Sequence, residues 1–178
     1  MSAIMTHRRI MFDPFQPNPE DIHIRDIAHA LSLLCRANGH FPHFYSVGQH
    51  SVLCMREAEA RGYSRRVQLG CLLHDASEAY LSDVTRPIKP LLPAYLEVEK
   101  SLQNMIFDKW ITPALSEEEQ ALIREIDDAI LHYEFLTMMG HAIYDPAPTL
   151  ASEPSFDFVM FEEMEQAFLR AFETLTDE

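Results

Sequence analysis

Side chains suited to binding a divalent metal ion stand in three separate segments of this chain. His50 lies in the stretch YSVGQHSVLC, His74 and Asp75 are adjacent in CLLHDASEAY, and Asp127 lies in EIDDAILHYE. Each stands among apolar residues, and a buried polar side chain must find a partner. Imidazoles and carboxylates are good ligands for divalent transition metals, so one ion would satisfy all of these groups at once.

Each residue taken alone also has a simpler explanation. A single histidine on a helix is more often a hydrogen-bonded core or surface residue, and Asp127 could equally be the exposed member of its pair with Asp128. The adjacent His74 and Asp75 are more specific, because two neighbouring polar groups interrupt an apolar face. The spacing therefore indicates a metal centre only if the fold brings the segments together.

The segments that carry these residues have the patterns of helices. Ser46 and Gln49 match a capping box, which places His50 one turn inside a helix. Ser116 and Glu119 give the same signature at the start of the helix that contains Asp127. The apolar periodicity predicts helices over about 46–62, 64–80 and 116–139.

Further helices are predicted over about 22–39, 94–110 and 158–175. Prolines interrupt the segments between several of these helices, and no strand-like alternation of any length is present. The predicted fold class is therefore all-α, a single-domain helical bundle. Its expected parts are an irregular segment 1–21, a core 22–144, and a linker with a C-terminal helix packed on the same domain, 145–178.

The composition limits the partners and the compartment. A formal charge of −14 disfavours DNA or RNA as a general partner, although a small phosphorylated compound is compatible with local basic groups or a metal. No apolar run approaches about 18 residues, so no membrane span is expected. Cys35, Cys54 and Cys71 lack metal-site or disulfide spacing and are interpreted as small buried thiols, which favours a cytoplasmic location.

The set H…HD…D on successive predicted helices resembles the HD-domain superfamily of metal-dependent phosphohydrolases. The stretches DIAHALSLLCRANGHFPHFYSVGQHSV and LLHDASEAYLSDVTRPIK are similar to the branch that includes the HD-type 5′-deoxynucleotidases. This resemblance implies an HD-type fold with His50, His74 and Asp75 as metal ligands. The last ligand best matches Asp127, since the sequence from there reads D-x-x-I-L-x-x-E, and Asp128 is the competing assignment.

The resemblance also implies roles around the ion. Glu78 stands where the nucleotidases have a glutamate near the catalytic water, Asp83 where an aspartate lies beside the phosphate site, and Arg36 where an arginine holds the nucleotide. Arg86 and Lys89, in the loop TRPIKP, would add positive charge. The simpler alternatives are a solvent-facing helix carboxylate for Glu78, a turn cap for Asp83 and a surface lysine for Lys89.

Members of the resembling superfamily that bind two metals carry extra histidines between the doublet and the last aspartate, whereas no histidine occurs here from Ala76 to Ile126. The resemblance therefore implies a single divalent ion, with Mn, Co, Fe, Ni, Zn and Mg all open. The expected activity is hydrolysis of (deoxy)nucleoside 5′-monophosphates. The alternatives are a triphosphohydrolase acting on dNTPs, a metal-containing module that senses a nucleotide without turnover, and a structural helical domain with coincidental histidines. A homodimer is expected from the habits of the resembling family and from an apolar stripe on the last helix.

Overall fold

The computed structural model describes residues 3–177 and has an all-α fold, as predicted. Within these residues the sheet structure is one antiparallel pair of short strands, β1 (Ile4–Met5) and β2 (Met11–Phe12). The α-helices are α1 (Ile24–Leu33), α2 (Val47–Ala60), α3 (Arg65–Leu73), α4 (Glu78–Leu81), α5 (Pro93–Trp110), α6 (Glu117–Met139) and α7 (Phe161–Thr176). None of the helices in this described part combines the length and the apolarity that crossing a bilayer requires.

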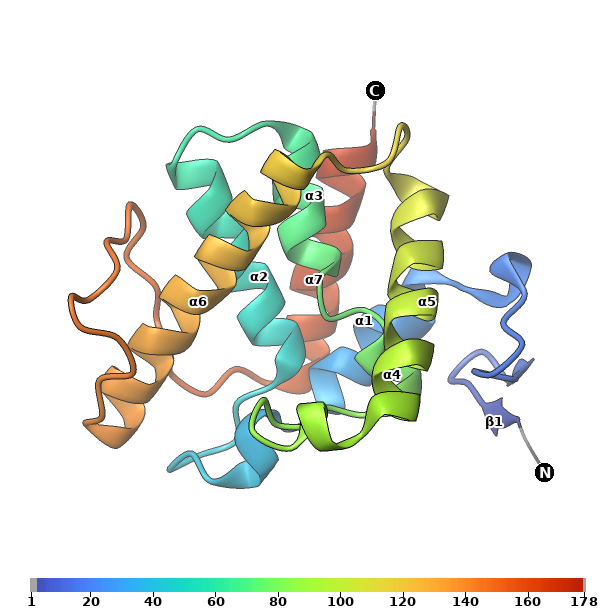
Figure 1. Ribbon diagram of the computed structural model, residues 1–178, viewed down its shortest axis with the longest axis horizontal. Helices are drawn as coiled ribbons and strands as arrows, with labels where there is room; N and C mark the ends of the chain where they lie inside the picture. Colours follow the sequence, from blue (N-terminus) through green and yellow to red (C-terminus); the bar gives the residue numbers. More distant parts are fainter. Residues whose placement is uncertain (1–2, 178) are drawn as a thin grey trace.

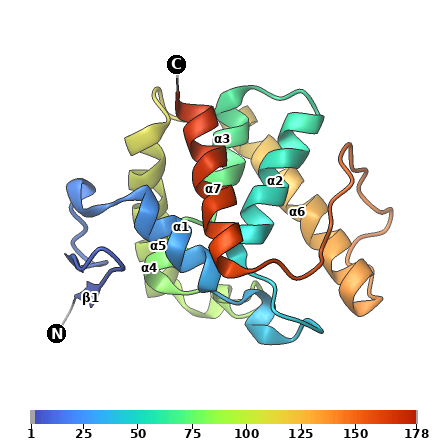
Figure 2. The same ribbon diagram turned by 180° about the vertical axis from the view of Figure 1, so that it is seen from behind.

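Helices α2 and α3 form the centre of the bundle and pack against each other (Figure 1). Helix α6 crosses both on one side, while α7 and α1 cover the opposite side (Figure 2). Leu72 of α3, Ile126 of α6 and Phe168 of α7 are all fully buried. Burying a large apolar side chain stabilises a fold by about 1.5–3 kcal/mol, so contacts of this kind fix the helices that carry the candidate ligands.

The predicted starts of α2 and α6 are confirmed. The Ser46 hydroxyl accepts the Gln49 backbone N–H at 3.0 Å, and Ser116 and Glu119 form the complete reciprocal capping box. The Gln49 side chain does not complete the first box. It donates instead to the carbonyl of Asp157, at 2.9 Å, in the loop before α7.

The helix predicted over 22–39 was wrong at its end, because α1 stops at Leu33. The Arg36 backbone N–H donates to the Tyr45 carbonyl at 2.9 Å, so this segment pairs with the strand-like approach to α2 rather than continuing the helix. Ala37 and Asn38 have φ of 53° and 51°, a left-handed conformation that ends helical structure. This turn carries the side chain of Arg36 toward the candidate site.

The single helix predicted over 64–80 was also wrong. Helix α3 ends at Leu73, and α4 begins at Glu78 after a turn that contains the His-Asp doublet. Gln103 of α5 stabilises this break: its side chain donates to the Leu73 carbonyl at 2.8 Å and accepts the Ser77 N–H at 3.1 Å. The doublet therefore lies on a turn fixed by a distant helix.

The apolar stripe of the last helix belongs to the core of the chain. Met164, Phe168 and Phe172 are buried where α7 packs on α1, α2 and α3. The helix begins at Phe161, a few residues later than predicted. Because this face is covered within the chain, it gives no support to a homodimer, which stays a prediction.

Candidate metal centre

The four predicted ligands converge from three elements. His50 Nε2 lies 3.1 Å from Asp127 Oδ1 and 3.2 Å from His74 Nε2, and His74 Nε2 lies 3.3 Å from Asp75 Oδ2. Metal–ligand bonds of about 2.0–2.3 Å place neighbouring ligand atoms roughly 3.0–3.6 Å apart at usual coordination angles. Two further pairs are longer, 3.9 Å from His50 Nε2 to Asp75 Oδ2 and 3.8 Å from His74 Nε2 to Asp127 Oδ1, so the spacing allows one ion among two imidazoles and two carboxylates.

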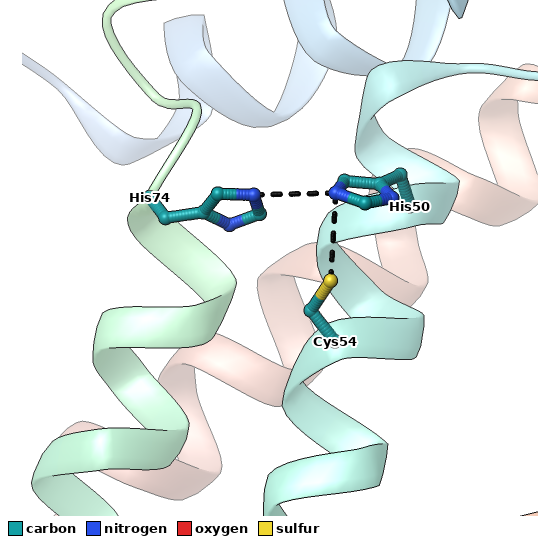
Figure 3. A group of neighbouring side chains, drawn as sticks. All are labelled: His50, Cys54 and His74. Carbon is teal, nitrogen blue, oxygen red and sulfur yellow. Dashed lines mark hydrogen bonds between the residues drawn. The ribbon is translucent and has the colours of Figure 1, made fainter. Parts of the chain in front are cut away.

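The hydrogen bonds of the two rings support this reading. Nδ1 of His50 lies 2.6 Å from a Glu134 oxygen, and Nδ1 of His74 lies 2.7 Å from the Cys71 carbonyl. With Nδ1 of each ring engaged by an acceptor, the Nε2 atoms of His50 and His74 face each other and are the ring atoms that an ion between them would contact (Figure 3).

Cys54 is a member of this cluster that the sequence interpretation missed. Its Sγ lies 3.4 Å from His50 Nε2, and the ligand atoms of His50, Cys54 and His74 all fall within 4.8 Å of one another (Figure 3). These three side chains could hold a metal ion. The sequence did contain a sign of this contact. Cys54 follows His50 by four positions, which places both side chains on one face of α2.

Glu134 forms the layer behind His50 and had no role in the sequence interpretation. It is fully buried, and besides His50 it accepts hydrogen bonds from the Tyr45 hydroxyl at 2.9 Å and from Arg36 Nε at 3.0 Å. Burial would raise the pKa of Glu134, but the charges of Arg36 and His50 and their hydrogen bonds lower it to about 2. Its only signal in the sequence was the final E of D-x-x-I-L-x-x-E.

Arg36 joins this buried layer to the candidate ligands. Its Nη1 lies 3.4 Å from Asp75 Oδ2, and its Nη2 lies 3.7 Å from Asp127 Oδ1. Burial opposes the charge of Arg36, but the surrounding carboxylates outweigh it and raise the pKa of the guanidinium. Arg36 is therefore a fixed cation beside the cluster.

A cavity of about 560 Å³ opens beside the cluster. Every predicted catalytic or substrate-binding residue lines it, together with two of the predicted ligands: Arg36, Asp75, Glu78, Asp83, Arg86, Lys89 and Asp127. The other lining residues are largely apolar and form an apolar wall that includes Phe41, Leu131, Phe135, Met139 and Ile143. Sequence reasoning missed this wall, although three of its members recur at four-residue steps along α6.

Glu78 is buried beside the cluster rather than facing solvent. Its Oε1 accepts from Lys89 Nζ at 3.2 Å, whereas its Oε2 is buried and has no hydrogen-bond partner among the described residues. Burial raises the pKa of Glu78 well above its ordinary value, and repulsion from Asp75 and Asp83 adds to the increase. Burial also raises the pKa of Asp83. The pair forms an acidic corner that retains protons more strongly than exposed carboxylates do.

The other two basic side chains of the cavity are already paired. Lys89 Nζ lies 2.7 Å from a Glu99 oxygen. Arg86 Nη2 lies 3.1 Å from Asp127 Oδ2, and its Nη1 lies 2.7 Å from Asp128 Oδ1. Asp128 contacts Arg86 and the Tyr144 hydroxyl, so the structure brings Asp127 into the cluster and leaves Asp128 outside it.

No protein-family model matches this sequence. The chain is similar to the uncharacterized protein YfdR of Escherichia coli, with 41% identity over 113 residues that cover 64% of this chain and 61% of YfdR. It is also similar to an uncharacterized protein of Rhodobacter capsulatus, with 36% identity over 118 residues that cover 63% of this chain and 59% of the relative. The matches thus span about three fifths of each relative, and neither name states an activity.

Proposed function

We propose that this chain is an HD-type metal-dependent phosphohydrolase that removes phosphate from (deoxy)nucleoside 5′-monophosphates. The proposal is carried by one observation: two imidazoles and two carboxylates converge beside a cavity that also holds a buried acid and three basic side chains. It agrees with the resemblance of the sequence to the HD-type 5′-deoxynucleotidases.

His50, His74, Asp75 and Asp127 would hold one divalent ion, and Glu134 would keep the His50 ring oriented. When bound, such an ion polarises a phosphoryl oxygen and lowers the pKa of bound water. Imidazoles together with carboxylates suit Mn, Fe, Co, Ni and Zn.

Glu78 is the candidate general acid and base. Its raised pKa brings proton uptake and release closer to neutral pH, where acid–base catalysis is most effective. Lys89 fixes Oε1 and leaves Oε2 free to hold or release a proton. Asp83, whose pKa is also raised, would orient a phosphate-side hydrogen bond.

The charge of the cavity favours a monophosphate over a triphosphate. Its basic side chains are Arg36, Arg86 and Lys89, and each already contacts carboxylates of the chain. A phosphomonoester carries about two negative charges at neutral pH, so it needs less compensation from these engaged groups and one divalent ion. A triphosphate carries more charge and would require basic groups that are not engaged within the protein.

The apolar wall supports a nucleoside as the rest of the substrate. Phe41 and Phe135 lie edge to face, with ring centroids 5.2 Å apart, and both line the cavity. An aromatic base buries apolar surface against such a wall, whereas a free sugar phosphate offers mainly hydroxyl groups.

The test is an assay of phosphate release from nucleoside mono- and triphosphates, with Mn, Co, Mg or a chelator. We expect metal-dependent orthophosphate release from monophosphates, lost in Asp75→Ala and retained in Asp108→Ala, a carboxylate of α5 outside the cavity lining. Tripolyphosphate release would replace the proposal with a triphosphohydrolase. Nucleotide binding without any turnover by the metal-loaded protein would replace it with a sensor.

A matched pair of variants tests the last ligand. Asp127→Asn should abolish tight metal binding, because it removes a carboxylate 3.1 Å from His50 Nε2. Asp128→Asn should leave metal binding intact. In the described residues the side-chain hydrogen bonds of Asp128 come from Arg86 and Tyr144, and neither of these is a candidate metal ligand. Isothermal titration with Mn²⁺ measures both, and the reverse result would move the ligand to Asp128.

A further inference from the structure

We infer that Cys54 is a sulfur ligand of this metal centre, and that it biases the site toward Zn, Co and Fe over Mg and Mn. The inference rests on the metal centre of the proposed function but not on any hydrolytic activity. It narrows the metal class, which the sequence leaves open.

The position of the sulfur fits coordination. Cys54 Sγ lies 3.4 Å from His50 Nε2, the same atom that lies 3.2 Å from His74 Nε2 (Figure 3). With a metal–sulfur bond of about 2.3 Å and a metal–nitrogen bond of about 2.0–2.1 Å, a sulfur and a nitrogen that are neighbouring ligands of one ion lie roughly 3.1–3.6 Å apart at angles of about 90–110°. The ligand atoms of all three side chains lie within 4.8 Å of one another, so one ion could contact the sulfur and both imidazoles.

The sulfur and the carboxylates occupy different sides of the cluster. Asp75 and Asp127 line the cavity, whereas Cys54 is 1% exposed and is not among the cavity-lining residues. The carboxylates would therefore face a substrate, while the sulfur would bind from the interior of the bundle. A ligand on the protected side can select the metal without obstructing the cavity.

The chemistry of sulfur predicts which metals gain. Thiolate is a soft ligand that strengthens binding of Zn, Co and Fe, whereas Mg and Mn prefer oxygen ligands. Burial keeps the free thiol protonated, because it raises the pKa of Cys54 to about 11. Coordination as a thiolate would release that proton to the buffer and would involve no transfer of electrons.

The other cysteines provide matched controls. Cys71 is equally buried, on α3, but it is not a member of the cluster. Cys35 is partly buried, and its thiol contacts the Arg36 carbonyl at 3.7 Å. The double variant Cys35→Ser/Cys71→Ser leaves Cys54 as the sole thiol. A test on this variant therefore does not depend on whether a Cys54 variant folds.

The first experiment titrates Co²⁺ into the chelator-stripped chain and into this double variant. Thiolate bound to Co²⁺ gives a near-ultraviolet charge-transfer band that nitrogen and oxygen ligands do not give. We expect the band in both proteins and its loss in Cys54→Ser. Co²⁺ bound without the band in the double variant would overturn the inference.

The second experiment compares affinities by competition. Cys54→Ser should weaken Zn²⁺ binding by more than the roughly 10–100-fold that loss of an outer hydrogen-bond partner costs, and should leave Mn²⁺ binding nearly unchanged. An equal loss for both ions would indicate a general disturbance and would overturn the metal preference.

These outcomes are separable from the proposed function. A charge-transfer band in a protein that releases no phosphate would sustain the sulfur ligand and reject the phosphohydrolase. Metal-dependent phosphate release together with a cobalt spectrum of nitrogen and oxygen ligands alone would sustain the phosphohydrolase and reject the sulfur ligand.

Discussion

Two fully buried glutamates lie near opposite ends of helix α2, Glu57 on the helix itself and Glu134 on α6, and their hydrogen-bond partners differ in kind. Glu57, near the end of α2, accepts hydrogen bonds from Arg61 at 2.7 Å and from the backbone N–H groups of Ala151 and Ser152, both at 2.9 Å. These contacts tie the loop that follows α6 to the surface of α2. Glu134, near the start of α2, instead holds a candidate metal ligand, His50.

The two carboxyls are otherwise similar. Burial alone would raise the pKa of each, and hydrogen bonds and nearby cations lower both. Burial and satisfied hydrogen bonds therefore do not distinguish an anchor from a site residue. The difference lies in what the partners contact next: Arg61 reaches Glu125 and the Thr149 carbonyl, whereas Arg36 reaches two carboxylates of the cavity.

The largest effect is expected from Glu57→Ala. Removing one member of a buried ion pair costs roughly 3–5 kcal/mol, because the remaining charge loses its partner. We expect a value near the lower limit, since Arg61 retains an ion pair with Glu125. Urea denaturation measures the free energy of unfolding, and metal affinity of the folded variant should match the parent protein. If Glu57→Ala lost metal binding without losing stability, Glu57 would act on the metal centre as Glu134 does, and the contrast between the two glutamates would be wrong.

Glu134→Gln should act mainly on the metal centre. The amide keeps the shape of the side chain but binds the His50 N–H more weakly, and loss of such an outer partner costs roughly 10–100-fold in metal affinity. Competition with a chelator of known affinity measures the change. If Glu134→Asp restores the metal affinity and Glu57→Gln leaves it unchanged, the loss in Glu134→Gln comes from the orientation of His50. It then does not come from a general loss of stability.

Tyr45→Phe is the gentler test of the same layer. It removes a hydrogen bond of 2.9 Å to Glu134 and leaves the contacts of His50 and Arg36 in place. A typical hydrogen bond contributes about 0.5–1.5 kcal/mol to stability, so the loss should be measurable by denaturation. Metal affinity should fall less than in Glu134→Gln, and an equal fall would show that Tyr45 is as important as the carboxylate.

The smallest effect concerns acid stability. The pKa of Glu57 in the folded protein lies below its ordinary value of 4.5, so its contribution is fully present above that value and is lost as pH falls through the folded pKa. Glu57→Gln should therefore flatten the decline of stability below pH 4.5. Unfolding free energies measured between neutral and acidic pH test this, with Glu97→Gln, at an exposed position of α5, as the control. Parallel pH curves for Glu57→Gln and the parent would contradict it.

Much of the fold was predictable because it depends on local patterns. The Ser116–Glu119 capping box fixed the start of α6, and periodic apolar residues identified α5 and α7 to within a few positions. The break between α3 and α4 was not predictable, because Gln103 stabilises it from another helix. The early end of α1 likewise depends on pairing with the segment before α2.

The amino-acid sequence by itself determined the helical class, the polar residues available for chemistry and the resemblance that selected four of them. Tertiary structure alone decided which of these atoms meet: it added Cys54 and Glu134 to the cluster and separated Asp127 from Asp128. The reason is physical. Periodicity reports which residues share a face of one helix, whereas a metal site depends on distances of a few ångströms between side chains on different helices.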